Sequence, residues 1–482
     1  MHNEMTQKIL KYIALGLMIL AINACNIQPL VQKQENKAVP DAYTADSTQD
    51  STNSADIKWK DFFSDPYLIA LIDTALGRNQ ELNIMLQEIN ISNNEVRARK
   101  GEYLPFVGLS GGSGLDKVGR YTRNGALEAN NEIRPGQEFP EPLPDFIFGA
   151  QASWEIDVWK KLRNSKKSAV FEYLASVEGK NFMVTHLISE IADAYYELLA
   201  LDNQLVILKQ NIQIQTNALE IVKLQKAAAK VTELAVRKFE AEVYKNRGRQ
   251  FYIEQQIVET ENRINFLMGR FPQPVQRSTS NIVDLKPLAI SSGLPSQLLA
   301  NRPDIRRAEM ELEASKLNVK AAKAEFYPSL KITSNLGYQA FNPKFLLSTP
   351  ESIIYGLAGE LLAPLVNRNA IKAHFYTANS KQVQAAFEYE KTILNAYIEV
   401  ANQLSKINNL EKSYDFMAKQ VDALNQSISI SNDLFASARA DYMEILMTQR
   451  DALDAKFELI ETKKMQLNAR VSVYKALGGG WK

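Results

Sequence analysis

Two very long tracts without helix-breaking residues constrain the fold of this chain most. Residues 160–269 contain no proline, and residues 367–477 contain neither proline nor glycine. An α-helix of ~60 residues would be ~90 Å long at 1.5 Å per residue, which is longer than a globular domain requires. Small and polar residues interrupt each tract once, at 227–232 and at 435–441. Each tract is therefore expected to fold as one long helix that turns and returns as a second.

Apolar residues in both tracts recur at the spacing of a coiled coil. Steps of three, four or seven residues separate them, and such seams indicate helices packed at small crossing angles. An ordinary helical bundle with hidden loops remains the alternative. The seam residues are Ile188, Ile191, Tyr195, Leu198, Leu205, Leu208 and Ile212 in the first tract, and Leu446, Leu453, Phe457, Ile460, Leu467, Val471 and Tyr474 in the second.

Parts of the sequence occur twice in the same order, which predicts an internal duplication. The matching segments are 80–82 with 303–305, 100–105 with 323–328, and 266–269 with 475–478. The first repeat is then 57–285 and the second 286–482. Each is expected to contain a helix, a β-hairpin (about 103–158 and about 328–366) and a long helical hairpin (about 160–270 and about 367–477).

Apolar and polar residues alternate in the segments between the helical tracts. One expected apolar face comprises Phe146, Phe148, Ala150, Ala152, Trp154 and Ile156, and the others comprise Leu330, Ile332, Ser334, Leu336 and Tyr338, then Ile353, Tyr355, Leu357 and Leu361. This pattern fits strands between lipid and an aqueous lumen, and equally a soluble sheet packed on helices. Four strands cannot close, and an open sheet edge cannot lie in lipid. If the strands span a membrane, several chains must share one barrel, and three chains would supply twelve strands.

The N-terminus has the pattern of a secretory signal. Lys8 and Lys11 precede a short apolar run, which predicts a signal peptide over 1–24. The only cysteine, Cys25, ends the sequence Ile22-Asn23-Ala24-Cys25, which resembles a bacterial lipobox. Cys25 is therefore expected to begin the mature chain and to carry lipid, with a buried free cysteine as the alternative. The resemblance to lipoprotein sorting rules favours the outer membrane, because Asn26 and not aspartate follows the cysteine.

Polar residues dominate the stretch that follows. Residues 25–56 are accordingly expected to form a lipidated tether. No later stretch of 18 uncharged apolar residues is present, so membrane-spanning helices are not expected in the mature chain.

The composition argues against several classes of function. Lys plus Arg number 56 against 55 Asp plus Glu, so there is no basic excess for binding nucleic acid. One cysteine and three separated histidines leave little for a metal site or acid–base catalysis. No HExxH, GxSxG, CxxC or Gly-rich phosphate loop is present. The chain is expected to be no enzyme and to need no cofactor beyond the lipid on Cys25.

Several motifs in order resemble a known family, the TolC-type outer-membrane efflux lipoproteins. The resemblance runs from about residue 57 to the C-terminus. The residues that carry it are Trp59, Phe62-Phe63 and Asp65-Pro66, the strand-to-helix motif Trp154–Trp159, the segments Gly293–Leu299 and Arg302–Glu309, and the end Tyr474–Trp481.

The resemblance implies a mainly α fold with a β-barrel, in which four strands per chain build a trimeric, twelve-stranded outer-membrane barrel continued by a long α-helical coiled-coil periplasmic tunnel. It implies a homotrimer in the outer membrane of a Gram-negative bacterium, in contact with outer-membrane lipids, that works with a periplasmic adaptor and an inner-membrane transporter of the resistance-nodulation-division type. Such a duct exports drugs, toxic compounds or metal ions passively. An exit channel for protein secretion, or a lipid-anchored coiled-coil scaffold without a pore, are the alternatives.

The resemblance also implies a gate at the far end of the helical hairpins. The family often has an aspartate three residues before an arginine there; this chain retains Arg450 and has Met447 at the aspartate position. Asp441, Glu444, Met447 and Arg450 recur every three residues, roughly one helical stripe. The hypothesis is that Met443 and Met447 narrow the mouth while the three charged residues restrain it. A solvated face with intrahelical ion pairs is the alternative.

The two helix turns align when the repeats are superposed. They lie at Lys230-Val231-Thr232 and at Arg439-Ala440-Asp441. The resemblance implies that the adaptor docks on these turns tip to tip.

Two strand exits depart from the family pattern. The family commonly has glycine where this chain has Lys160 and where it has Asn367-Arg368-Asn369. The turn geometry at these exits is therefore open, because only glycine adopts a left-handed conformation without steric cost.

Overall fold

The computed structural model describes residues 30, 33–43, 51–286, 289–437 and 439–482. The expected signal peptide and Cys25 lie outside the described residues. The chain divides into two compact units. The sheet unit holds Asn90–Leu174 and Met310–Ala386, with the described residues up to Gln34, and the hairpin unit holds Glu35–Ile89, Ala175–Glu309 and Phe387–Lys482. Both sequence repeats contribute to each unit, so the compact units cut across the repeats.

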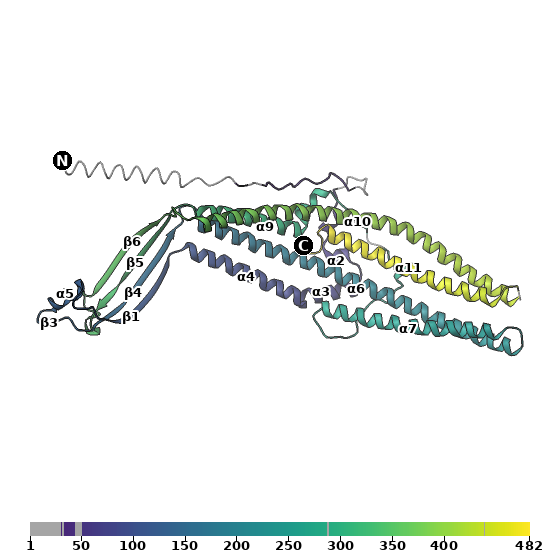
Figure 1. The fold of residues 1–482 in the computed structure, drawn as a ribbon. Coiled ribbons are helices and arrows are strands. Elements are labelled where there is room, and N and C mark those ends of the chain that lie inside the picture. The colour runs from purple at the N-terminus through teal and green to yellow at the C-terminus, as the bar shows by residue number, and fades with distance from the viewer. Residues whose placement is uncertain (1–29, 31–32, 44–50, 287–288, 438) are drawn as a thin grey trace. The chain divides into compact units, whose positions relative to one another are not determined.

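Four long antiparallel strands form the centre of the sheet unit (Figure 1). They are β1 (Phe106–Asp116), β4 (Leu143–Ile156), β5 (Ser329–Ala340) and β6 (Ile353–Leu362), in the order β1-β4-β5-β6. The central β4–β5 pair joins the two repeats, with Phe148 opposite Tyr338 and Trp154 opposite Ile332. β1 and β6 are the edges of this sheet, with no further strand beside them in the described residues.

The register places the expected apolar residues of neighbouring strands on one face of the sheet. Ala150 lies opposite both Leu109 and Leu336, and Leu336 lies opposite Tyr355. Directly opposed residues of an antiparallel sheet point to the same side, so the alternation predicted from the sequence is confirmed. Tyr355 and Leu357 are exposed on this face.

The two strand connections differ between the repeats. The β1–β4 connection contains α5 (Arg123–Ala129), β2 (Glu132–Arg134) and β3 (Gln137–Glu138), whereas β5–β6 contains only a short 3-10 turn, Pro343–Phe345. Arg134 of the longer connection lies over the ring of Phe345, 4.3 Å from its centroid. The expected hairpin over about 103–158 thus encloses an ordered insertion that sequence alternation did not predict.

The strand exits that lack the family's glycines keep a left-handed backbone. Lys160 has φ 62° and Asn367 has φ 52°. After Lys160 the helix α6 (Lys161–Ala227) begins, and the buried carboxylate of Asp157 accepts hydrogen bonds from the amides of Leu162 and Arg163, at 3.0 and 2.9 Å. The capping hydrogen bonds of the Asp157 carboxylate thus hold Lys160 in a backbone conformation that lysine disfavours.

Replacing Lys160 with glycine should therefore stabilise the protein. A non-glycine residue in the left-handed region costs roughly 1–2 kcal/mol, and glycine's extra unfolded-state entropy offsets part of this gain. We expect Lys160→Gly to raise the unfolding temperature at a fixed heating rate and Lys160→Val to lower it. Asn367→Gly should have the smaller effect, because asparagine tolerates this conformation. A lower unfolding temperature for Lys160→Gly would contradict this assignment.

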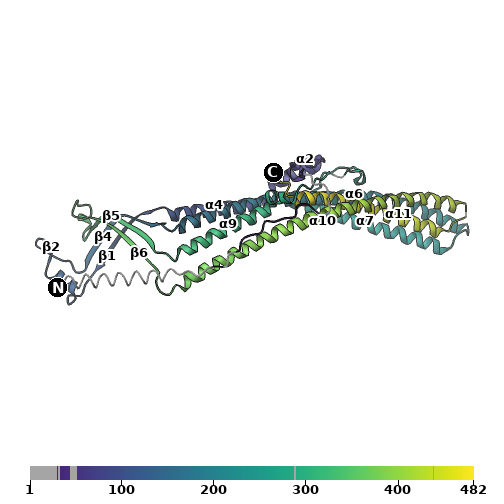
Figure 2. The ribbon, with the colours of Figure 1, turned by 90° about the horizontal axis from the view of Figure 1, so that it is seen from above.

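Long helices pair in the hairpin unit. α7 (Glu233–Leu267) lies beside the later part of α6, and α11 (Tyr442–Ala476) lies beside α10 (Asn369–Ala436) (Figures 1 and 2). The helix breaks expected at 227–232 and 435–441 are confirmed. The heptad prediction is also confirmed, because every seam residue is either buried or packed against a buried cluster. The other helices are α2 (Trp59–Phe62), α3 (Pro66–Arg78), α4 (Gln80–Tyr103), α8 (Leu298–Asn301) and α9 (Pro303–Ala324).

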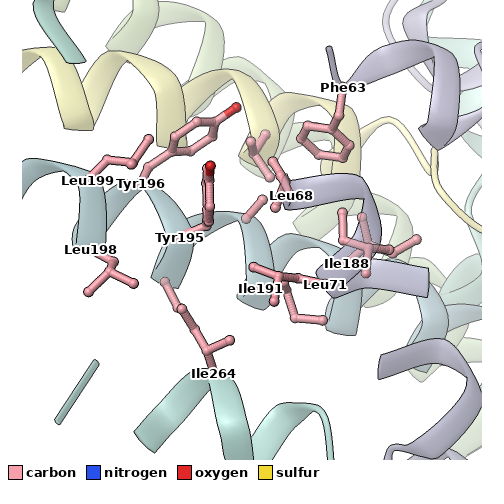
Figure 3. Packing of buried hydrophobic residues seen from close by; sticks show 14 of the residues in the cluster. Phe63, Leu68, Leu71, Ile188, Ile191, Tyr195, Tyr196, Leu198, Leu199 and Ile264 are labelled. Carbon is pink, nitrogen blue, oxygen red and sulfur yellow. The ribbon is translucent and has the colours of Figure 1, made fainter. Parts of the chain in front are cut away.

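A large apolar core packs the N-terminal helices against the hairpins. Leu68 and Leu71 of α3 meet Ile191 of α6 and Ile264 of α7 (Figure 3). Asp65 caps α3 through the amide of Tyr67 (2.9 Å), and its second carboxylate oxygen accepts a hydrogen bond from the hydroxyl of Tyr195 (2.6 Å). The Asp65-Pro66 motif therefore fixes where α3 begins and docks it on α6. None of the described helices is both long and apolar enough to cross a membrane.

Candidate functional site

Equivalent contacts close both repeats at the end of their helical hairpins. In the first repeat the side-chain amide of Asn79 donates to the backbone carbonyl of Leu267, at 2.9 Å. In the second, Arg302 donates to the carbonyl of Ala476, at 2.7 Å. These carbonyls belong to the last turns of α7 and α11, which leave acceptors without intrahelical donors. The duplication is therefore visible as a shared way of satisfying a helix C-terminus.

The buried Arg302 is the centre of an ion network whose two carboxylates are partly exposed. Its guanidinium pairs with Asp304 at 2.6 Å and with Glu399 at 2.8 Å. Burial alone would lower the pKa of Arg302, but the hydrogen bonds and charges of Asp304 and Glu399 outweigh it and raise that pKa above its ordinary value. The indole of Trp481 donates to the carbonyl of Asn301 at 3.1 Å. These contacts, here called the Arg302 lock, thus hold the Arg-Pro-Asp segment against the C-terminal Gly-rich end.

A second buried charge lies on α6 at Asp193. One of its oxygens is buried without a hydrogen-bond partner among the described residues. Burial raises the pKa of Asp193 to about 6, against the opposing charges of Lys475, Arg263 and Lys406. These cations come from α11, α7 and α10, so the carboxylate lies among three other helices.

Asp193 is expected to make stability fall as pH rises. A carboxylate with a raised folded pKa binds more protons in the folded state, so stability is lost between the ordinary pKa of 3.8 and about 6. Asp193→Asn should remove this pH dependence and stabilise the protein at neutral pH by on the order of 2–3 kcal/mol. Unfolding temperatures between pH 4 and 8 test this. An unchanged pH profile in Asp193→Asn would show that another group titrates.

The two helix turns share an equivalent backbone hydrogen bond. The amide of Lys230 donates to the carbonyl of Gln225 (2.9 Å), and the amide of Arg439 donates to the carbonyl of Leu434 (2.8 Å). Thr232 and Asp441 both occupy the N-cap of the returning helix. The side chains of Lys230, Thr232, Arg439 and Asp441 are exposed, whereas those of Val231 and Ala440 are half-buried.

One apolar cluster draws the two turns together. Leu219, Val222, Val236 and Phe239 of the first hairpin pack with Leu446 of the second. Val231, Tyr442 and Met443 pack against this cluster from its edge. The turns of both repeats therefore form one end surface of the hairpin unit. Tyr442 and Leu446 were not expected at this site, although Leu446 was recognised as a seam residue.

The expected gate residues do not all share one environment. Asp441, Glu444 and Met447 are exposed, and Met447 is 46% exposed. Arg450 is half-buried and pairs with its neighbour Asp451 at 3.2 Å. Met443 packs against the apolar cluster instead. The structure therefore gives the two methionines different surroundings: Met443 contacts the apolar cluster, and Met447 is exposed.

Asp441 is placed to interact beyond its own helix. Thr232 accepts a hydrogen bond from the amide of Ala235 (3.4 Å), as an N-cap residue should. Asp441 makes no such side-chain bond to α11. The carboxylate at the start of α11 is thus left to other donors, near the positive end of the helix dipole.

The chain combines a four-stranded sheet that has an exposed apolar face with paired coiled-coil hairpins. This combination is the architecture of an outer-membrane channel subunit. Residues 71–270 and 294–479 match the family described as "Outer membrane efflux protein". The two matched segments cover both repeats, and this chain belongs to that family.

Curated relatives span nearly the whole chain. The solvent efflux pump outer membrane protein SrpC of Pseudomonas putida is 26% identical over 476 residues, covering 96% of this chain and 97% of the relative. The probable outer membrane lipoprotein SilC of Salmonella typhimurium is 24% identical and covers 98% of this chain and 99% of its own. The cation efflux system protein CusC of Escherichia coli is 25% identical, with coverage of 96% and 97%.

Solved structures share the fold. A membrane protein from Pseudomonas aeruginosa superposes with a TM-score of 0.83 at 21% identity, covering 94% of this chain and 100% of that one. The open state of the MtrE outer membrane channel of Neisseria gonorrhoeae gives 0.81 at 23% identity, covering 95% and 99%. The expected fold class, a helical tunnel with a barrel, is confirmed.

Proposed function

We propose that this protein is the outer-membrane exit duct of a tripartite efflux pump, and that it passes small molecules without chemistry of its own. The observation that carries the proposal is the four-stranded sheet with one exposed apolar face, joined in the same chain to long paired helices. Relatives named for solvent and cation efflux support the small-molecule cargo. A periplasmic adaptor and an inner-membrane transporter would complete the pump.

The exposed apolar face of the sheet is suited to lipid. Leu109, Leu336, Tyr355 and Leu357 are each more than 60% exposed on it, which is unusual for a protein surface in water. Trp154 and Trp159 lie where strand β4 ends, and their indoles donate to the carbonyls of Tyr103 (3.2 Å) and Pro328 (2.8 Å). Aromatic residues with a polar tip favour the membrane interface. A scaffold without a pore would have no need of this surface.

The unpaired edges of the sheet favour a homotrimer. β1 and β6 would expose backbone donors and acceptors to lipid, where they find no partners. Pairing β6 of one copy with β1 of the next removes every edge, and three copies supply twelve strands. Such a barrel would be wide enough for an aqueous lumen.

Exposed apolar seams on the helices favour the same assembly. Tyr244, Phe251 and Val258 follow one another at seven-residue intervals on α7 and are exposed in the single chain. Phe387 and Leu394 do so on α10. Sequence-regular apolar stripes of this kind are covered by a partner helix in coiled coils, and we assign that partner to a neighbouring copy.

The lipid on Cys25 would anchor each copy to the outer membrane. The lipobox-like sequence supports this assignment, as does the relative named as an outer membrane lipoprotein. The adaptor would dock on the exposed turn residues Lys230, Thr232, Arg439 and Asp441, together with Val231 and Ala440.

The gate would be formed by Asp441, Glu444, Met447 and Arg450 of each copy. Threefold symmetry would place three copies of each exposed side chain in a ring. The carboxylate of Asp441, which makes no capping hydrogen bond to α11, could accept hydrogen bonds from a neighbouring copy. Met443, packed in the cluster, would support the turn and not line the mouth.

Single-channel conductance tests this gate. Asp441→Ala and Arg450→Ala should each raise the conductance of the closed channel several-fold, because each removes a polar restraint. Glu458→Ala, an exposed change further along α11, should leave it unchanged. Wild-type conductance in Arg450→Ala would remove Arg450 from the gate.

Dye accumulation in cells separates efflux from secretion. Loss of this chain should raise the steady-state accumulation of a fluorescent cationic dye, and the wild-type chain should restore it. If dye levels stay constant while secreted proteins disappear from the medium, the duct serves protein secretion.

A further inference from the structure

The turn that follows helix α7, residues 268–274, is held in one conformation by the buried Asn265. The side-chain amide of Asn265, which is 1% exposed, donates to a backbone carbonyl of the turn at 2.7 Å. Its side-chain oxygen accepts a hydrogen bond from Nε of Arg270 at 2.6 Å. Gly269 has a left-handed backbone (φ 63°) and leaves no room for a Cβ against the carbonyl of Arg78, at the end of α3. The turn is therefore rigid and lies directly against the end of α3.

This rigid turn exposes aromatic rings to solvent. Phe271 is 92% exposed, and Phe266 on the last turn of α7 is 69% exposed. The equivalent end of the second repeat turns its aromatic residue inward, because Trp481, which follows Gly478, donates its indole N–H to the carbonyl of Asn301 at 3.1 Å. A single exposed apolar side chain would need no explanation, but here two rings flank one fixed turn. The first repeat thus displays what the second repeat covers.

Two guanidinium groups lie beside these rings. The side chain of Arg78 is exposed and that of Arg270 is half-buried, and neither forms an ion pair with a carboxylate in the part of the chain that the structure describes. Burial and the charge of Arg78 both lower the pKa of Arg270. The carboxylate of Glu261, which also accepts from the backbone just after the turn, pairs with Arg277 instead. The two cations therefore lack a counter-anion within the chain. We call Arg78, Phe266, Arg270 and Phe271 the Arg–Phe patch.

The chemistry of the Arg–Phe patch fits a carboxylate-bearing glycopeptide. A guanidinium binds a carboxylate through two parallel hydrogen bonds, and an exposed aromatic ring packs against the C–H face of a sugar. Four side chains are far fewer than the 20–30 residues per partner of a stable protein–protein interface. They suit a repetitive polymer, to which several copies of the patch in one assembly would bind together.

We propose that the Arg–Phe patch binds the peptidoglycan wall, with its arginines on carboxylates of the stem peptides and Phe271 on a sugar ring. This inference rests on the proposed function, because a duct that continues from the outer membrane to an inner-membrane transporter must cross the wall. The wall is a polymer of N-acetylated sugars joined by peptides that carry carboxylates, so it supplies both groups that the patch recognises.

Co-sedimentation of the purified mature protein with purified sacculi tests the contact. Wild type should sediment with native sacculi and several-fold less with sacculi whose carboxyl groups have been amidated. The double variant Arg78→Gln/Phe271→Ala should bind native sacculi several-fold less than wild type. The matched control is Arg237→Gln, since Arg237 is an exposed arginine of α7 that already pairs with Glu233 and Glu240, and it should bind as wild type does.

The double variant should keep its fold, because neither substituted side chain makes a hydrogen bond among the described residues. Its unfolding temperature should therefore match that of wild type. Wild-type binding by the double variant, or equal binding of wild type to native and amidated sacculi, would overturn the proposal.

Thiol labelling distinguishes the wall from a neighbouring copy as the occupant of the patch. Phe271→Cys in the assembled protein should react with a membrane-impermeant maleimide, with wild type as the blank for Cys25, and added sacculi should slow the reaction several-fold. A thiol at position 271 that stays unreactive in the assembled protein would show that another copy covers the patch, and would overturn the proposal.

Dye accumulation in cells measures the proposed function separately, because sacculus binding is assayed without transport. Reduced sacculus binding of the double variant with wild-type dye efflux would support the wall contact. Normal sacculus binding with lost efflux would place a pump component on the patch and overturn the proposal. If wild type binds sacculi but cells that lack the chain accumulate no extra dye, the proposed function fails and the wall contact stands.

Discussion

Replacing Gly149 with alanine is expected to disrupt the four-stranded sheet. Gly149 of β4 lies opposite Gly337 of β5. A Cβ at Gly149 would lie 2.6 Å from the carbonyl oxygen of Leu336 and 2.7 Å from the Cα of Gly337. The contact is with backbone, and both strands are paired on both sides, so neither can move away. Overpacking typically costs about 1–3 kcal/mol, and we expect about 3 kcal/mol or more at this site.

The assembled fraction in the outer membrane measures this effect. Gly149→Ala should lower the fraction that resists urea extraction, and Gly337→Ala should do the same, because its Cβ meets the carbonyl of Phe148 at 2.5 Å. Gly114→Ala on β1 is the matched control, since a Cβ there meets no described atom within 4 Å. Wild-type assembly of Gly149→Ala would contradict the close approach of the two strands.

Replacing Arg302 with alanine is expected to be the most destabilising change in the hairpin unit. It would leave the carboxylates of Asp304 and Glu399 without their cation and the carbonyl of Ala476 without its donor. Removing one partner of a fully buried ion pair costs roughly 3–5 kcal/mol, and we expect the lower end of this range here because Asp304 and Glu399 are partly exposed. We expect the unfolding temperature of the purified protein to fall by several degrees at a fixed heating rate.

The duplication supplies the control for Arg302. Asn79→Ala removes the equivalent contact of the first repeat but only one neutral hydrogen bond, so its cost should be about 1–3 kcal/mol. Arg302→Lys keeps the charge but loses the forked geometry that reaches two carboxylates, and should fall between wild type and Arg302→Ala. Equal unfolding temperatures for Arg302→Ala and wild type would show that the lock does not hold α11.

Local periodicity explains why much of the fold could be predicted. The seam from Ile188 to Ile212 is visible because a helix repeats its environment every three or four residues. The apolar face of β4 is visible because strand side chains alternate. The breaks at 227–232 and 435–441 follow from small and polar residues. Each of these signals lies within a short window of sequence.

Long-range contacts explain what could not be predicted. Nothing near Arg302 in the sequence indicates that its partner Glu399 lies 97 residues away. Residues 33–43 are mostly polar and lack a period, so only the structure reveals that Tyr43 is buried against Tyr397. The sequence gives Met443 and Met447 the same residue type, but of these two methionines only Met443 packs against the apolar cluster around Leu446. At Lys160 the backbone is left-handed despite the residue, because the Asp157 cap fixes it.

The native mass of the mature protein, extracted from outer membranes in mild detergent, tests the central claim most directly. The sheet has two unpaired edges in the described residues, so a single copy cannot close a barrel. The account predicts a particle with three copies of the 54.3 kDa chain, less its signal peptide, plus lipid and detergent. A stable monomer, or release by salt without detergent, would contradict a shared barrel and favour a lipid-tethered scaffold.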